Sequence, residues 1–306
     1  MQKAKLYSKL PDKKIRCSAC QFNCLIENGT VGHCQTRLNK NGVLYSLTYG
    51  VITGIQIDPI EKKPLYHFKP GSLVASIGSL GCNFRCKQCL NFTHSYGAKE
   101  TLRALIRKPI KPLPSQTIIN QVLKQGLKGI AFTFNEPVIN PEFVHDTAKL
   151  AKEKGLFTVI VSNGSWTKEA LNYYGKFIDA ANIDLKGFSQ KTYQKQGASF
   201  RKIPEMLIWA KKKKIHLELT TLIIPTINDN FTELGKMARW IKENLGADTP
   251  WHLSRFSPKL APDPNFQKLP PTPLALLKKA TQIGRQEGLN FVYTWPSRNA
   301  RIREDD

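Results

Sequence analysis

The chain has 306 residues, of which 41% are apolar, and 46 lysines and arginines against 23 aspartates and glutamates give a net charge of +23. A chain of this length can bury a substantial core, and it holds no apolar run of about 18 residues, which excludes a transmembrane helix. The basic N-terminus lacks an apolar signal core, so we expect a cytoplasmic protein. The positive charge favours anionic partners, although a lysine-rich solvated surface is its commoner explanation.

Two groups of cysteines account for all seven cysteines of the chain. The first group is Cys17, Cys20, Cys24 and Cys34, and the second is the CxxxCxxC motif of Cys82, Cys86 and Cys89. A reducing cytoplasm keeps thiols free, so such groups indicate metal sites rather than disulfides. Four thiolates suit a tetrahedral zinc ion or an iron–sulfur cluster. Three suit an iron–sulfur cluster, or a zinc ion that takes a fourth ligand from elsewhere.

The first 70 residues do not follow the pattern of the rest. After the four cysteines comes a hairpin-like stretch, NKNGVLYSLTYG, with Asn41 and Gly42 as its turn. An extended, proline-punctuated connector, DPIEKKPLYHFKPGS, comes next. We therefore predict a small metal-bearing module and connector over residues 1–70, and a larger core with a C-terminal extension over residues 71–306.

Beyond residue 70, short apolar runs alternate with longer helical stretches. The runs are apolar on both faces, which is typical of buried parallel strands. They are Leu73–Gly78, Gly129–Phe134, Phe157–Val161, Ala181–Leu185, His216–Ile223 and Trp251–Phe256. The helical stretches are Ser115–Gln125, Pro141–Lys154, Thr167–Gly175, Ile203–Lys213, Thr232–Asn244 and Pro271–Glu287, and a final apolar run, LNFVYTW, follows them. Strands alternating with helices predict a barrel-like or open parallel α/β sheet.

Polar residues accompany each strand, and a parallel α/β barrel carries its active site at the carboxyl ends of its strands. Cys82, Cys86 and Cys89 come directly after the first strand. The stretches FTFNEPVI, VSNGSW, NIDLKGF, LELTTLIIPTINDN and PWHLSRFSP accompany the next five strands. Each stretch alone is a weak signal, but together they predict one shared mouth lined by polar side chains.

Taken together, these motifs resemble those of radical S-adenosylmethionine (SAM) enzymes. The CxxxCxxC motif follows the first strand, and Asn135, Glu136 and Pro137 stand where that family usually has Gly-Gly-Glu. Within the family, the chain is similar to the relatives of pyruvate formate-lyase activating enzyme and, among them, to the radical SAM member of the AmmeMemoRadiSam system. The motifs SLTYG, DPIEKKPLYHF, GCNFRC, DLKGF, LIIPTINDN and PWHLSRF extend the resemblance over most of the chain.

The resemblance implies a partial (β/α)6 barrel of the TIM type and a [4Fe–4S] cluster on Cys82, Cys86 and Cys89. Three protein ligands leave one iron open, which SAM chelates through its amino and carboxylate groups. The implied reaction is reductive cleavage of SAM to methionine and a 5′-deoxyadenosyl radical, which abstracts hydrogen from an organic substrate. The protein would then be an oxidoreductase whose cofactors carry the chemistry.

The resemblance also implies roles for residues at the strand ends. Asn135 and Glu136 are expected near the amino group of the methionine part of SAM, with Pro137 fixing the exit of the strand. Ser162 and Asn163 are expected near the ribose.

Asp184 and Lys186 match the family's Asp-Leu-Lys motif and are expected between SAM and the substrate, with an ordinary ion pair as the alternative. His252 is expected near the ribose, with a hydrogen-bonded core histidine as the alternative. Gln88 departs from the family, which usually has an aromatic residue before the third cysteine.

Partners follow from the same resemblance. An electron donor of the flavodoxin or ferredoxin type is implied, and the AmmeMemoRadiSam system adds AMMECR-domain and Memo-like proteins. One alternative keeps the radical chemistry but makes the protein an activase that installs a glycyl radical in a protein. Another, suggested by the charge of +23, is a basic nucleic-acid-binding protein with structural metal sites.

Overall fold

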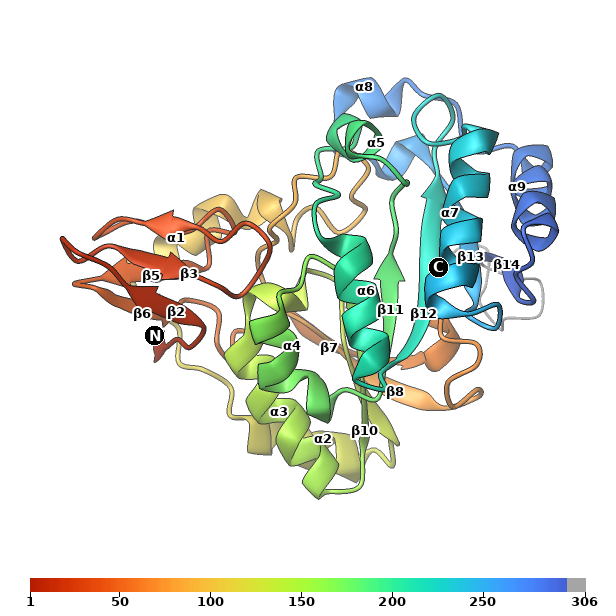
Figure 1. The fold of residues 1–306 in the computed structure, drawn as a ribbon. Coiled ribbons are helices and arrows are strands. Elements are labelled where there is room, and N and C mark those ends of the chain that lie inside the picture. The colour runs from red at the N-terminus through yellow and green to blue at the C-terminus, as the bar shows by residue number, and fades with distance from the viewer. Residues whose placement is uncertain (296–306) are drawn as a thin grey trace.

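The computed structural model describes residues 1–295 and is built around one eight-stranded sheet (Figure 1). Its strands are β7 (Gly54–Pro59), β8 (Leu73–Gly78), β9 (Gly129–Phe132), β10 (Phe157–Ser162), β11 (Ala180–Asp184), β12 (His216–Ile223), β13 (Trp251–Arg255) and β14 (Val292–Trp295). They are ordered β14-β13-β12-β11-β10-β9-β8-β7. All neighbours are parallel except β7, which runs antiparallel to β8 at the edge. The six predicted strands are confirmed.

Helices connect the strands, as a parallel sheet requires. They are α1 (Lys99–Arg107), α2 (Ser115–Lys124), α3 (Pro141–Glu153), α4 (Lys168–Tyr174), α5 (Gln190–Lys195), α6 (Ile203–Lys212), α7 (Phe231–Leu245), α8 (Pro264–Gln267) and α9 (Leu274–Gln286). Short 3-10 helices are η1 (Ile60–Lys62), η2 (Tyr96–Ala98), η3 (Pro137–Ile139), η4 (Gly175–Phe177) and η5 (Pro258–Leu260). All six predicted helices are confirmed, whereas the short α1, α5 and α8 were not predicted.

Sequence signals at the helix ends explain some of these boundaries. The Thr167 side chain caps α4 by accepting a hydrogen bond from the backbone N–H of Ala170 at 3.1 Å. Asn140 precedes α3 but makes no capping bond. Its amide instead donates to the Thr48 carbonyl at 3.0 Å and accepts from the Ser46 hydroxyl at 3.1 Å. Asn140 therefore joins the barrel to the N-terminal residues.

The N-terminal residues form two three-stranded sheets, which project from the barrel at the left of Figure 1. Their strands are β1 (Gln2–Lys3), β2 (Tyr7–Lys9), β3 (Ile15–Cys17), β4 (Leu25–Ile26), β5 (Arg37–Lys40) and β6 (Val43–Ser46). The predicted hairpin is confirmed, because β5 pairs with β6 and both turn residues, Asn41 and Gly42, have positive φ angles. A buried ion pair of 2.9 Å between Arg37 and Glu142 joins this part to α3.

The connector is built into the barrel instead of lying outside it. Strand β7 leads into the connector, with which it shares Asp58 and Pro59, and pairs along its whole length with β8. Further along, the backbone N–H groups of Tyr66 and His67 donate to the Glu218 carboxylate of β12 at 2.9 and 2.8 Å. The division at residue 70 therefore remains a prediction, and residues 296–306 of the expected core lie outside the described residues.

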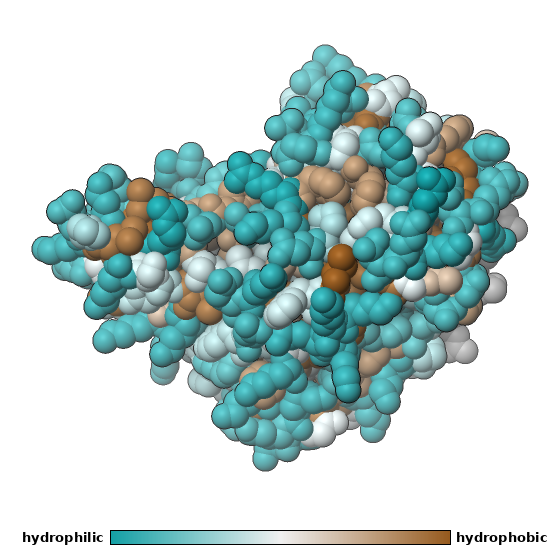
Figure 2. Space-filling view, viewed as in Figure 1, coloured by the Kyte–Doolittle hydropathy of each residue, from teal (hydrophilic) through white to brown (hydrophobic). Residues whose placement is uncertain are grey.

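The surface in Figure 2 is covered mainly by hydrophilic side chains, with small scattered hydrophobic patches. Within residues 1–295, no helix combines the length and the apolar character that crossing a membrane requires.

Candidate active site

Cys82, Cys86 and Cys89 lie on the loop that leaves the carboxyl end of β8, which we call the cluster loop (residues 79–95). The backbone N–H of Phe84 donates to the Cys82 Sγ at 3.3 Å. Burial raises the pKa of all three thiols, and the charges of Glu136, Cys86 and Cys89 add to this effect at Cys82. The three thiols of this loop are therefore close enough to influence one another electrostatically.

Asn135 follows β9 and holds the start of the cluster loop. Its Oδ1 accepts a hydrogen bond from the backbone N–H of Ser79 at 3.0 Å. Its Nδ2 donates to the carbonyl of Gly81 at 3.1 Å. Both ends of the amide are thus used to fix the backbone that leads into Cys82.

Glu136 joins the ends of β9 and β10. It is buried, and its carboxylate accepts from the backbone N–H of Asn163 at 2.7 Å and the hydroxyl of Ser162 at 2.8 Å. It also accepts from Val138 at 3.0 Å, in the turn that begins with Pro137. Burial raises the pKa of Glu136 to about 7, although these three hydrogen bonds partly offset the effect. Glu136 therefore orders the loop that carries Ser162 and Asn163.

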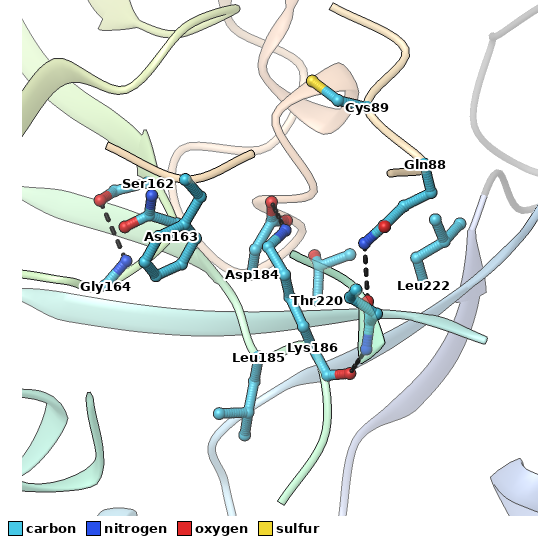
Figure 3. Close-up of polar contacts among 12 residues, drawn as sticks. Gln88, Cys89, Ser162, Asn163, Gly164, Asp184, Leu185, Lys186, Thr220 and Leu222 are labelled. Atoms are coloured by element: carbon cyan, nitrogen blue, oxygen red, sulfur yellow. Dashed lines mark hydrogen bonds and ion pairs between the residues drawn. The ribbon is translucent and has the colours of Figure 1, made fainter. Parts of the chain in front are cut away.

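Ser162 and Asn163 end β10, and their side chains are anchored. Figure 3 shows Ser162 accepting from the backbone N–H of Gly164, at 3.1 Å. The Asn163 Nδ2 donates to the Asn83 Oδ1 at 2.9 Å and lies 3.9 Å from the Cys82 Sγ. This loop consequently contacts the cluster loop directly.

Asp184 and Lys186 form an ion pair of 2.9 Å at the end of β11. The Asp184 side chain is 43% exposed and that of Lys186 is 14% exposed. Burial lowers the pKa of Lys186, but the charges of Asp184 and then Cys86 outweigh it and raise the pKa overall. Figure 3 shows the pair between Asn163 on one side and Gln88 on the other. Lys186 thus holds a positive charge beside the thiols.

Gln88 links the cluster loop to the loop after β11, a contact that the sequence did not predict. The Gln88 Nε2 donates to the Gln196 Oε1 at 2.6 Å, and the Gln196 Nε2 donates to the Lys186 carbonyl at 2.6 Å (Figure 3). Gln196 must present its amide nitrogen to that carbonyl, so the orientation of both side chains follows from the network. The side-chain amides of Gln88 and Gln196 therefore connect the backbone of Lys186 to the residue that precedes Cys89.

Comparisons with known proteins identify the family. The model of the radical SAM superfamily matches residues 76–241. The chain belongs to the radical SAM superfamily. An uncharacterized protein of Methanocaldococcus jannaschii is 38% identical over 96% of this chain and 84% of its own length. The pyruvate formate-lyase-activating enzyme of Clostridium pasteurianum is 26% identical over 53% of this chain and 66% of its own length.

Among solved structures, the crystal structure of Streptococcus suis SuiB bound to S-adenosylmethionine has a similar fold. It aligns with a TM-score of 0.50 and 13% identity, over 70% of this chain and 48% of SuiB. The predicted partial α/β barrel is therefore confirmed, and this radical SAM chain is an enzyme that uses SAM and a [4Fe–4S] cluster.

The chemistry of the cluster loop fits such a cluster. Iron–sulfur clusters are held by cysteine thiolates, and this loop supplies three that are close in sequence and electrostatically coupled. Within residues 1–295, no group of three or more cysteine, histidine or carboxylate side chains has the arrangement of ligands around a single metal ion.

His252 of β13 lies at the same level across the sheet as Asp184 of β11, with Thr220 of β12 between them. The His252 ring is completely buried, and its Nε2 lies 2.7 Å from the Glu218 Oε2. Its Nδ1 has no hydrogen-bond partner among the described residues. The observed partner is thus a buried carboxylate, and the expected place near the ribose remains a prediction.

The thiols of Cys17, Cys20, Cys24 and Cys34 influence one another electrostatically. Burial raises the pKa values of Cys20 and Cys24, and the charges of Cys34 and Cys17 raise both further. All four cysteines are free thiols. Four soft ligands within one module suit either tetrahedral zinc or a second iron–sulfur cluster in chemical terms.

Proposed function

We propose that Cys82, Cys86 and Cys89 hold the [4Fe–4S] cluster of this radical SAM enzyme, and that Asp184 and Lys186 line the place where SAM meets the substrate. The observation that carries this proposal is the convergence of loops from β8, β9, β10 and β11 on these three thiols. When bound, the cluster and SAM supply one-electron reduction and a 5′-deoxyadenosyl radical, which takes a hydrogen atom from an organic substrate.

The side chains of the chain position these groups. Asn135 fixes the backbone before Cys82, and Glu136 orders the loop of Ser162 and Asn163. Lys186 places a cation beside the thiols, which favours their deprotonated, metal-binding form. Lys186 and Asp184 can also orient a polar substrate group, because the Asp184 side chain remains half exposed beside the pair.

The proposal also includes the partner proteins of this enzyme and its location in the cell. A radical SAM enzyme needs an electron donor, and we expect a flavodoxin or ferredoxin type. AMMECR-domain and Memo-like proteins are the further partners that we propose. Seven free cysteines support a reducing compartment, which agrees with the cytoplasm.

Reductive cleavage of SAM tests the cluster site. Anaerobically reconstituted protein with dithionite and SAM is expected to release 5′-deoxyadenosine, and Cys82→Ala is expected to abolish the release and to lower the bound iron by the four ions of this cluster. Thr93→Ala changes an exposed residue of the same loop and is the matched control. Release by Cys82→Ala at the rate of the unaltered protein would refute the assignment of this ligand.

A protein substrate is the second candidate, because a pyruvate formate-lyase-activating enzyme is among the relatives. In that case the hydrogen atom is taken from the Cα of a glycine residue in the partner protein. Electron paramagnetic resonance of candidate partner proteins mixed with the reconstituted enzyme and SAM would show a glycyl radical. A small organic product without any protein radical would instead support the first candidate.

We further propose that Cys17, Cys20, Cys24 and Cys34 bind a metal. The N-terminal module has only a small hydrophobic core of its own, consisting of Ala4, Ile15, Cys17, Ala19, Ile26 and Leu44, whereas Cys20 and Cys34 pack in the main core. Small modules with so little core usually depend on metals or disulfides for stability. Metal and sulfide analysis of anaerobically purified protein distinguishes zinc from a second cluster. Protein with neither metal nor sulfide beyond one [4Fe–4S] cluster would contradict this proposal.

A further inference from the structure

The connector buries a lysine against the sheet of the barrel. Lys63 is only 4% exposed, and its Nζ forms an ion pair of 2.7 Å with the Asp58 Oδ2. The hydroxyl of Ser76 in β8 donates to the same carboxylate oxygen at 2.6 Å. The backbone on both sides of Lys63 is fixed by buried side chains of the connector, which pack against residues of four neighbouring strands; this group consists of Ile60, Leu65, Val74, Ala131, Val159 and Ala180. The ammonium group of Lys63 therefore has a defined position.

Phe134, in the loop after β9, has a backbone conformation that is unusual for its side chain. Its φ angle is +69°. The backbone N–H of Asn135 donates to the carbonyl of Thr133 at 2.9 Å, which closes a γ-turn with Phe134 at its centre. A γ-turn with positive φ is rare and strained, and a bulky residue with positive φ is an outlier. Such strain persists only where the surrounding structure enforces it.

Two contacts of the ring enforce this conformation. The Lys63 Nζ lies over the face of the Phe134 ring, 5.1 Å from its centroid, which is within the range of a cation–π interaction. Gly78, at the end of β8, lies against the same ring, because a Cβ added there would come within 2.8 Å of the Phe134 Cδ2. Glycine at position 134 would adopt the observed φ angle without strain. A phenylalanine at this position therefore indicates that the ring itself is used.

The two residues after Phe134 organise the candidate active site. The Asn135 side chain binds the backbone of the cluster loop at Ser79 and Gly81, at 3.0 and 3.1 Å. The Glu136 carboxylate accepts from the backbone N–H of Asn163 at 2.7 Å. The direction of the chain at residue 134 determines where both side chains begin. The strained turn thus controls two loops that converge on the three thiols.

We propose that Lys63 and Phe134 are positioning residues, through which the connector holds Asn135 and Glu136 in the geometry that SAM binding requires. This inference rests on the proposed function, in which the cluster loop binds the [4Fe–4S] cluster and SAM. Lys63 acts on Phe134 through its charge, and Phe134 acts on Asn135 and Glu136 through the backbone. Strained residues of this kind occur most often at active sites, where they hold groups in place before the ligand binds.

The experiment measures 5′-deoxyadenosine formation by the anaerobically reconstituted full chain over a range of SAM concentrations. Phe134→Leu removes the ring, and it is expected to raise the KM for SAM about tenfold while the iron and sulfide content stays unchanged. Lys63→Met removes the cation, and it is combined with Asp58→Asn so that no buried carboxylate is left unpaired. This second protein is expected to show the same change in KM. Lys62→Met is the matched control, because Lys62 lies 3.7 Å from the other oxygen of Asp58, and its KM should stay within about twofold of the unaltered protein.

Three further proteins separate positioning from packing. The combination of Phe134→Leu with Lys63→Met and Asp58→Asn should raise KM no further than either change alone, because both break the same contact. Phe134→Gly permits the backbone angle without the ring and should behave like Phe134→Leu. Lys63→Arg keeps the cation and should keep KM within about threefold of the unaltered protein.

The proposal is refuted if Phe134→Leu leaves KM unchanged, if the effects of the two changes multiply, or if Phe134→Gly behaves like the unaltered protein. It is also refuted if iron content and thermal midpoint fall together with the rate at unchanged KM, which is the result expected of a residue that only packs. If Phe134→Leu does not fold, the protein with Lys63→Met and Asp58→Asn carries the same test. Failure of the proposed function is distinct, because the unaltered protein would then form no [4Fe–4S] cluster or release no 5′-deoxyadenosine.

Discussion

Glu218→Gln should destabilise the fold, because this carboxylate holds the connector inside the barrel. The side chain is completely buried and its two oxygens accept four hydrogen bonds. The donors are Tyr66 and His67 through their backbone N–H groups, at 2.9 and 2.8 Å, and the rings of His252 and His216, at 2.7 and 3.1 Å. Glutamine keeps one acceptor oxygen and turns an NH2 group toward donors.

The size of the effect follows from the lost bonds. Each buried hydrogen bond left unmade costs about 1–3 kcal/mol, so we expect a loss of about 3–5 kcal/mol in the free energy of unfolding at pH 7. Burial by itself would raise the pKa of Glu218, but the hydrogen bonds from His216 and His252 outweigh it and lower the pKa from 4.5 to about 2. The ionised group therefore stabilises the fold fully above its unfolded pKa, by about 3 kcal/mol, and this is lost as pH falls toward 2.

Urea denaturation of the metal-free full chain, followed by tryptophan fluorescence, measures both quantities. The difference between the unaltered protein and Glu218→Gln should be about 2 kcal/mol smaller at pH 3 than at pH 7. Glu169→Gln alters an exposed glutamate of α4 and should change stability by less than about 0.5 kcal/mol. A Glu218→Gln protein as stable as this control at pH 7, or a difference independent of pH, would refute the reasoning.

Three other variants test the site and its supports. Lys186→Met removes the buried cation beside the thiols. It should retain the iron content but lower the yield of 5′-deoxyadenosine about tenfold or more. An unchanged yield would contradict this role of Lys186. Arg37→Met leaves the buried Glu142 carboxylate unpaired, so urea denaturation should show a loss of about 3–5 kcal/mol, and a loss below about 1 kcal/mol would be inconsistent with the pair. Gly197→Ala should lower the thermal midpoint and the iron uptake far more than Gly126→Ala. Both glycines have φ near +70°, at +75° and +67°, but only the Cβ at position 197 meets the backbone of the cluster loop. Equal effects of the two would contradict the contact.

The sequence alone predicted the parts of the fold that depend on local pattern. Runs such as Gly129–Phe132 are apolar at every position because both faces of a parallel strand are covered, so their position could be read directly. The turn at Asn41 and Gly42 could be predicted because few residues adopt positive φ at two successive positions. The spacing of Cys82, Cys86 and Cys89 likewise indicated a site with three thiolate ligands.

Only the tertiary structure decided which distant residues meet. Strand β7 follows a module outside the barrel, and nothing in its own pattern indicates that it pairs antiparallel with β8. Gln88 and Gln196 are 108 positions apart, and the bond between them depends on how two loops fold over the barrel. Asn83 gives no sequence signal at all, because a single asparagine between two cysteines is uninformative until its neighbours are known. The sequence pattern of a strand depends on which of its faces are buried, so it can be read locally. The hydrogen-bond partners of a loop side chain depend on which distant residues the folded barrel brings close to it.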